Sequence, residues 1–268
     1  MMRLPIRIFS DLHLGHRASR ITDLEELRPL FSGAGTVVFN GDTWEEMAEL
    51  WKPRSAEMLA GMKRVLKEEG CDSVFLRGNH DPGWKGPAYL SLAEGKILIT
   101  HGDALIRNAS PWKREVLSGK AVVEGIWSNH PDASHDLESR LEVARQIAIQ
   151  LQSRHLPNAR NLFSRAIDAL WPPRRALAML SAWSRQGSLG AEFCQTYSPE
   201  TEFLILGHFH RRAIHSSHGR TVINTGSFVV PGPASWVSWD GKALSTGSVK
   251  KYRDSFALGP TSRSWEIF

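Results

Sequence analysis

Short apolar runs, rich in β-branched and aromatic residues, recur along the first hundred residues and return after residue 200. Their length and composition predict buried strands. The clearest candidates are residues 6–9, 37–40, 73–76, 97–100 and 203–206, and two further ones are 220–224 and 235–239, joined by turns that carry Gly and Pro.

Helical patterns separate these runs. Leu24, Leu27 and Leu30 fall on one helical face, and residues 54–69 carry apolar side chains at helical spacing before Gly70, a residue type that commonly ends helices. Strands that alternate with helices predict an α/β fold, a sheet flanked by helices.

The pattern changes after Asp103, where strand signals nearly disappear until Thr201. Two series of apolar residues at helical spacing, with Pro172 and Pro173 after the second, predict three helices. We therefore expect a core of residues 1–103 and 201–268 and a mostly helical insert, residues 104–200, that acts as an arginine-rich lid. The two series are Leu137, Leu141, Ala144, Ala148, Leu151 and Phe163, Ile167, Leu170.

Composition and charge narrow the picture only in part. The chain has 268 residues, 41% hydrophobic and 23% charged, which is enough to bury a full core. A net charge of +5 favours an anionic partner without separating nucleotide, nucleic acid and phospholipid, and no nucleic-acid-binding module is recognisable. Cys71 and Cys194 have neither metal nor redox spacing.

The cellular location can be predicted from the apolar runs and from the N-terminal residues. No apolar run is long enough to span a bilayer, and a signal peptide is not expected because cleavage would remove the candidate site residues Asp11 and His13. We expect a cytoplasmic protein, with peripheral contact of the insert with the inner face of the membrane left open.

Candidate ligands for metal ions follow the predicted strands directly. Because strand ends in α/β sheets gather at one edge, these polar residues are expected to converge there. A single Asp or Asn at such a place is more often a turn residue. Five such places in one chain favour a shared site, formed by Asp11, His13, Asp42, Asn79, His80, His101, His208 and His210.

These residue types suit two divalent ions that share a bridging ligand. Asp42 offers a carboxylate that can bridge, and Asn79 offers a neutral amide oxygen. His208 and His210 flank Phe209 at a spacing that would direct both imidazoles to one side of an extended segment, and Gly207 would let the backbone approach closely.

The order of these blocks resembles the calcineurin-like metallophosphoesterase superfamily, over residues 6–226 without the insert. The matching blocks are Asp11-Leu12-His13, Gly41-Asp42, Gly78-Asn79-His80-Asp81, His101 and Gly207-His208-Phe209-His210. The resemblance implies a four-layer αββα sandwich with a binuclear metal site. Asp11, His13, Asp42 and His210 would hold one ion, and Asp42, Asn79, His101 and His208 the other. His80 would face the substrate as acid or phosphate contact, oriented by Asp81.

A narrower resemblance rests on His101-Gly102-Asp103, the helical insert and Asn224-Thr225-Gly226-Ser227-Phe228. Together these are similar to the UDP-2,3-diacylglucosamine pyrophosphohydrolase-like branch, which implies manganese under a helical lid, with iron or zinc as alternatives. The best-known members carry Arg where this chain has His80, which leaves a different substrate open. Arg140 and Arg145 of the insert are candidate substrate contacts, although arginines on a solvated helix face would look the same.

Three functions compete at this stage. The first is hydrolysis of an anionic phosphate ester or pyrophosphate by a hydroxide that two metal ions activate. The second is a nuclease or cyclic-nucleotide phosphodiesterase, and the third is a scaffold of the same fold without turnover, which the complete set of ligand positions disfavours. If the insert only selects the substrate, its removal should leave hydrolysis of small esters intact.

Overall fold

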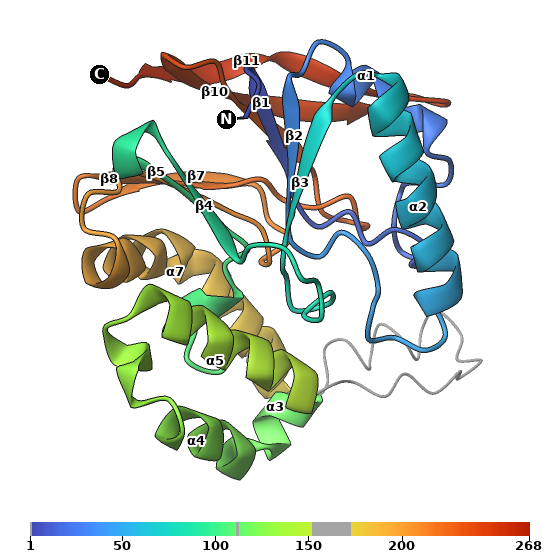
Figure 1. The fold of residues 1–268 in the computed structure, drawn as a ribbon. Helices are drawn as coiled ribbons and strands as arrows, with labels where there is room; N and C mark the ends of the chain where they lie inside the picture. The colour runs from blue at the N-terminus through green and yellow to red at the C-terminus, as the bar shows by residue number, and fades with distance from the viewer. Residues whose placement is uncertain (1, 111–112, 152–172) are drawn as a thin grey trace.

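Two β-sheets lie face to face in the computed structural model, which describes residues 2–110, 113–151 and 173–268 (Figure 1). The six-stranded sheet has the order β11-β10-β9-β1-β2-β3, and the five-stranded sheet has the order β4-β5-β6-β8-β7. The strands of the first are β1 (Ile6–Phe9), β2 (Thr36–Asn40), β3 (Asp72–Leu76), β9 (Ser235–Trp239), β10 (Ala243–Lys251) and β11 (Phe256–Glu266). Those of the second are β4 (Tyr89–Leu92), β5 (Ile97–Thr100), β6 (Phe203–Leu206), β7 (Ala213–Ser217) and β8 (Arg220–Asn224).

Alternating side chains along the strands build a core between the two sheets. Ile8 of β1 and Val38 of β2 pack against Ile99 of β5 and Ile205 of β6 in one buried cluster. The side chains between them point outward, so that β1, β2, β5 and β6 are buried on both faces. This explains why the strands of the sequence-predicted core read as continuous apolar runs.

Helices from the first half of the chain cover the outer face of the six-stranded sheet. They are η1 (Glu25–Leu27), α1 (Arg28–Phe31) and α2 (Lys52–Glu68). Phe9 and Phe39 point to this side and pack against Leu59 and Met62 of α2. The predicted helix at residues 54–69 is therefore α2, which also lies beside this sheet in Figure 1.

The insert covers the outer face of the five-stranded sheet. Leu204 of β6 and Val222 of β8 share a buried cluster with Val143, Ile147 and Phe193 of the insert. The layers are thus helix, sheet, sheet and helix, which confirms the α/β sandwich (Figure 1). In the part of the insert that the structure describes, the helices are η3 (Asp103–Leu105), α3 (Arg114–Ser118), α4 (Lys120–Ser128), η4 (Pro131–Ser134), α5 (Leu137–Gln150) and α7 (Pro173–Tyr197).

Two features of the insert bear on its predicted role. Pro173 begins α7 as expected, whereas the series Phe163, Ile167 and Leu170 lies outside the described residues. The shared cluster with β6 and β8 makes the insert the fourth layer of the sandwich, so its removal would expose the outer face of that sheet. Within the described ranges, no helix is both long and apolar enough to cross a membrane.

Four strands escaped the sequence analysis, namely β4, β7, β10 and β11. Three of them lie at sheet edges, where one side of the strand has no neighbour and polar residues are tolerated. β11 contains Pro260 and mostly exposed side chains, which is typical of an edge strand. Their sequences therefore lack the apolar runs that reveal the central strands.

Candidate metal centre

Parallel strands from both sheets deliver the candidate ligands to one place. β1, β2 and β3 run parallel in one sheet, and β5, β6 and β8 run parallel in the other. The loops that leave the carboxyl ends of β1, β2, β3, β5 and β6 carry every ligand that the sequence predicted. The site is therefore shared between the two sheets, at the edge where parallel strands end.

One group of four ligands lies around Asp11. Donor atoms of Asp11, His13, Asp42 and His210 all lie within 4.8 Å of one another. His210 Nε2 is 3.2 Å from Asp11 Oδ1 and 3.2 Å from His13 Nε2, and His13 Nε2 is 3.7 Å from Asp42 Oδ2. Two carboxylates and two imidazoles at these distances fit one divalent ion.

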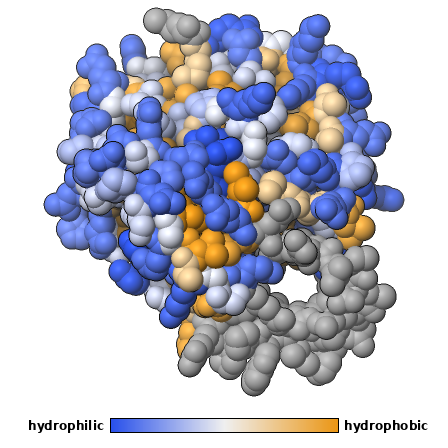
Figure 2. All heavy atoms as spheres, turned by 60° about the horizontal axis from the view of Figure 1, so that its bottom comes forward, coloured by the Kyte–Doolittle hydropathy of each residue, from blue (hydrophilic) through white to orange (hydrophobic). Residues whose placement is uncertain are grey.

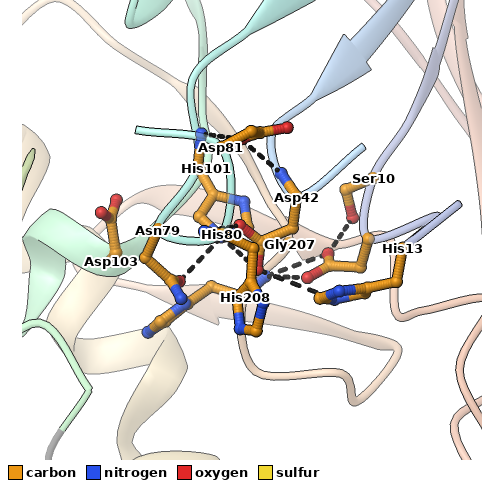
Figure 3. Close-up of polar contacts among 12 residues, drawn as sticks. Ser10, His13, Asp42, Asn79, His80, Asp81, His101, Asp103, Gly207 and His208 are labelled. Carbon is orange, nitrogen blue, oxygen red and sulfur yellow. Dashed lines mark hydrogen bonds and ion pairs between the residues drawn. The ribbon is translucent and has the colours of Figure 1, made fainter. Parts of the chain in front are cut away.

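The second group shares Asp42 with the first. His101 Nε2 lies 3.3 Å from Asp42 Oδ2 and 3.2 Å from Asn79 Oδ1. The rings of His101 and His208 are 5.2 Å apart, and Nε2 of His208 donates to the carbonyl of Ala109 at 3.0 Å. Figure 3 shows the side chains of His13, Asn79, His101 and His208 gathered around Asp42. Asp42 belongs to both groups, because its Oδ2 lies near Nε2 of both His13 and His101.

Left-handed backbone brings most of these side chains inward. Asp11, His13, Asp42, His208 and His210 all have φ between +46° and +66°, although none is glycine. Such residues cost about 1 to 3 kcal/mol each and persist only where the surroundings hold them. The expectation of an extended segment at 208–210 was wrong, because both histidines adopt this conformation and turn the loop sharply.

Glycines allow the ligand loops to touch. A Cβ atom at Gly207 would lie 2.1 Å from Oδ2 of Asp11, and one at Gly41 would lie 2.5 Å from Nδ1 of His101. No side chain fits at either position without moving a ligand. The predicted close approach at Gly207 is confirmed.

Neighbouring groups hold the carboxylate of Asp11. The hydroxyl of Ser10 donates to Oδ2, and the backbone N–H of His208 donates to the carboxylate at 3.1 Å. The loops after β1 and β6 are thereby joined at the site.

The charges of the buried ligands are matched to one another. Burial acts to raise the pKa of Asp42, but His101 and His80 lower it well below its usual range. Burial likewise acts to lower the pKa of His101, but Asp42 and then Asp11 raise it well above its usual value. Ionised carboxylates at this depth require positive charge beside them, which protonated imidazole or a divalent ion can supply.

Glu45 is a site residue that the sequence analysis missed. It is 2% exposed, and Oε1 lies 2.6 Å from Nδ1 of His13 while Oε2 lies 2.9 Å from Nδ1 of His80. The two imidazoles hold the pKa of Glu45 far below its usual range despite its burial. The sequence feature that could have indicated this role is the position of Glu45, a carboxylate three residues after Asp42 in the same loop.

Asp81 has a different task from the one expected. Its carboxylate accepts the backbone N–H groups of Gly78 at 2.7 Å, Thr43 at 2.8 Å and Asp42 at 3.2 Å. Asp81 therefore fastens the loop after β3 to the loop after β2, and Glu45 is the carboxylate that orients His80. Burial and then Asp42 raise the pKa of Asp81 to about 7.

A carbonyl group orients His101. Its Nδ1 lies 3.0 Å from the oxygen of Asn40, which fixes the ring with Nε2 toward Asp42. The carboxylate of Asp103, two residues further along the chain, accepts the backbone N–H of Ala104 at 3.1 Å.

A cavity of about 520 Å³ opens beside the ligands. Asp42, Asn79, His80, His208 and His210 form part of its lining. The rest of the lining is largely apolar and comes from α7 and three loops: Ser110, Lys113, Met179, Trp183, Phe209, Arg211 and residues 229–233.

Neither predicted arginine contact lines this cavity. Arg140 is 4% exposed, donates to the carbonyl of Ile106 at 2.9 Å and lies over the ring of Trp127. Arg145 donates to the carbonyl of Pro82 at 2.8 Å and pairs with Glu142. The structure thus gives both side chains a packing role in the insert. Among the described residues, the basic side chains that line the cavity are Lys113 and Arg211.

Comparison with solved structures found similar chains at low sequence identity. A predicted phosphoesterase of Streptococcus pneumoniae is 13% identical over 98% of this chain and 97% of that one, with a TM-score of 0.41. The phosphoesterase YfcE of E. coli is 15% identical over 99% and 100%, with a TM-score of 0.41. Vps29 of Chaetomium thermophilum is 12% identical over 99% and 96%, with a TM-score of 0.45.

Two comparisons of the sequence gave different results. A search of curated protein sequences found no match. The family model of the calcineurin-like phosphoesterases matches residues 4–212, which include all the ligands described above. The chain belongs to the calcineurin-like phosphoesterase family.

Proposed function

We propose that this protein is a metal-dependent hydrolase of a phosphate ester or pyrophosphate. The observation that carries the proposal is the convergence of six candidate ligand side chains around the shared carboxylate of Asp42, with His80 and a cavity beside them. When bound, two divalent ions supply an activated water nucleophile and neutralise negative charge on the phosphoryl group.

The donor set supports two ions of hard or borderline character. Asp11, His13, Asp42 and His210 would hold one, and Asp42, Asn79, His101 and His208 the other. A proton on Nε2 of His208, held by Ala109, places the imidazole lone pair on Nδ1, by which His208 would bind. Mixed oxygen and nitrogen donors suit manganese, which we propose as the native metal, with iron and zinc as alternatives.

His80 is the proposed acid and phosphate contact. Its side chain is 27% exposed and lines the cavity, so it can reach a substrate. Glu45 accepts a hydrogen bond from Nδ1 of His80, which orients the ring and leaves Nε2 as the nitrogen that can meet a substrate. A group placed in this way can donate a proton to a leaving oxygen or stabilise charge on phosphate.

The cavity supports a substrate with a large apolar part. Trp183 and Met179 of α7 and residues 229–233 offer apolar surface beside the ligands, and Lys113 and Arg211 offer positive charge. A phosphoryl group at the ions with an apolar group in the cavity fits this arrangement. We propose a nucleotide-lipid similar to UDP-2,3-diacylglucosamine as the substrate class.

Exposed hydrophobic residues near the cavity support contact with a membrane surface. Leu177 and Leu180 of α7 are 64% and 53% exposed, and Val230, which lines the cavity, is 60% exposed. Figure 2 shows hydrophobic surface, in orange, gathered on the face turned toward the viewer. We propose a cytoplasmic protein that binds the inner membrane face peripherally when it collects a lipid substrate.

A substrate screen with metal-depleted and manganese-loaded protein tests this function. The panel contains a UDP-diacylglucosamine-type nucleotide-lipid, bis-p-nitrophenyl phosphate, cyclic nucleotides and single-stranded DNA. Asp42→Asn removes the negative charge of the carboxylate that both proposed ions would share. Glu57→Gln, on the exposed side of α2, makes the same change from carboxylate to amide away from the site and is the matched control.

We expect the highest kcat/KM for the nucleotide-lipid, complete dependence on added metal, and loss of turnover in Asp42→Asn only. Preference for DNA or cyclic nucleotides would favour the nuclease or phosphodiesterase function instead. Metal binding without turnover of any member would favour the non-catalytic scaffold.

A further inference from the structure

Helix α7 of the insert holds the loop that carries His208 and His210. The indole N–H of Trp183 donates to the carbonyl of Phe209 at 2.8 Å. Phe209 lies between the two ligand histidines, and its 2% exposed ring belongs to the cluster that the insert shares with the five-stranded sheet. The insert thereby contacts both the main chain and the side chain of this residue.

A second contact reaches the same loop through one intermediate. Oε1 of Gln186 accepts from Nδ2 of Asn224 at 3.0 Å, and the same Nδ2 donates to the carbonyl of Gly207 at 2.8 Å. Gln186 and Asn224 are each 1% exposed. Because a buried polar group without its partner costs free energy, Gln186 helps to fix the orientation in which the Asn224 amide can hold Gly207, together with the N–H of Gly226 that donates to Oδ1 of Asn224 at 2.9 Å.

The loop needs such support because its conformation is strained. His208 and His210 have φ of +66° and +52°, which a non-glycine residue adopts only when its surroundings impose it. The carbonyl groups of Gly207 and Phe209 are held by Asn224 and Trp183, so the backbone is fixed immediately before and immediately after His208.

We propose that Gln186 and Trp183 are positioning residues for the metal ligands His208 and His210, so that the insert is part of the scaffold of the metal centre. The inference rests on the proposed function, because it concerns the same site. It also reverses one expectation from the sequence: loss of the insert should weaken the metal centre and not merely change the choice of substrate.

Cobalt binding to the metal-depleted protein tests the inference without reference to turnover. The variants are Gln186→Met, which keeps length but removes the acceptor, and Trp183→Phe, which keeps an aromatic ring but removes the N–H donor. Ser184→Ala is the matched control on the same helix, because Ser184 is exposed and its hydroxyl donates only within α7 to the carbonyl of Ser181. Dissociation constants for Co²⁺, the visible absorption of the bound ion and thermal unfolding of the metal-free protein are measured for each.

We expect Gln186→Met and Trp183→Phe to raise the Co²⁺ dissociation constant about 2- to 10-fold each, the range of one lost hydrogen bond, and to alter the absorption bands. Ser184→Ala should match the wild type. Folded variants with a lower unfolding temperature but unchanged affinity and spectrum would overturn the inference and leave the proposed function standing. A wild-type protein that binds no Co²⁺ would overturn both.

Discussion

Oε2 of Glu45 lies 2.9 Å from Nδ1 of His80, while its other oxygen lies 2.6 Å from Nδ1 of the ligand His13. One buried carboxylate therefore orients both a metal ligand and the proposed acid. Glu45→Gln should weaken both roles, because a neutral amide makes a weaker hydrogen bond to each imidazole than a carboxylate does and so holds both rings less firmly.

For Glu45→Gln we expect metal affinity to fall about 10- to 100-fold, the usual effect of removing a partner of a ligand. At saturating metal, kcat should still fall substantially, because His80 is no longer held. Titration of metal against hydrolysis of bis-p-nitrophenyl phosphate separates the two effects. Full recovery of kcat at high metal would show that Glu45 serves His13 alone.

His80→Ala should lower kcat about 10²- to 10⁴-fold, the contribution typical of a general acid. Bound metal should stay at the wild-type amount, because His80 belongs to neither proposed ligand set. Metal content by mass spectrometry and single-turnover hydrolysis are measured on the same preparation. Loss of bound metal in this variant would instead identify His80 as a ligand.

Gly207→Ala should abolish metal binding, because the added Cβ would lie 2.1 Å from Oδ2 of Asp11. Moving the backbone or the carboxylate is expected to cost about 1 to 3 kcal/mol of unfolding free energy. Gly125→Ala on α4 is the control, since its Cβ would meet nothing within 4 Å. Chemical denaturation and metal titration of both variants check the prediction, and wild-type affinity in Gly207→Ala would contradict it.

Metal affinity should rise with pH around neutrality. The pKa of His101 is raised well above its usual value in the metal-free site, so its imidazole holds a proton at pH 7 that a metal must displace. The pKa of His208 is lowered to about 3, mainly by burial and then by the nearby charge of His101, so His208 is already neutral at pH 7. Calorimetric titration of metal in two buffers of different ionisation enthalpy should detect proton release on binding at pH 7. Metal binding without proton release would contradict the predicted rise of affinity with pH.

The central strands and the convergence of the candidate ligands could be predicted because their physical causes are local. A strand buried on both faces, such as β6, reads as a continuous apolar run. Ligands such as Asp42 then follow at the strand ends, where parallel strands place them together. The family resemblance added the pairing of these residues into two metal sites.

Residues that support the site through tertiary contacts could not be predicted from the sequence. Glu45 and Gln186 occupy ordinary positions in a loop and a helix, and only the packed structure brings them against His80 and Asn224. Arg140 was misread for the same reason. Its place in the insert is typical of a solvated or ligand-binding arginine, whereas the structure buries it between Ile106 and Trp127.

The central claim is that two ions, joined through Asp42, carry the hydrolysis. The most direct test adds Mn²⁺ stepwise to metal-free protein and follows bound metal and phosphodiester hydrolysis together, in the wild type, Asp42→Asn and Asn79→Ala. We predict that activity appears as binding approaches two ions per chain, and that both folded variants fail to reach this occupancy and stay inactive. Full activity in folded Asp42→Asn, or turnover by the wild type in excess chelator, would contradict the two-ion account.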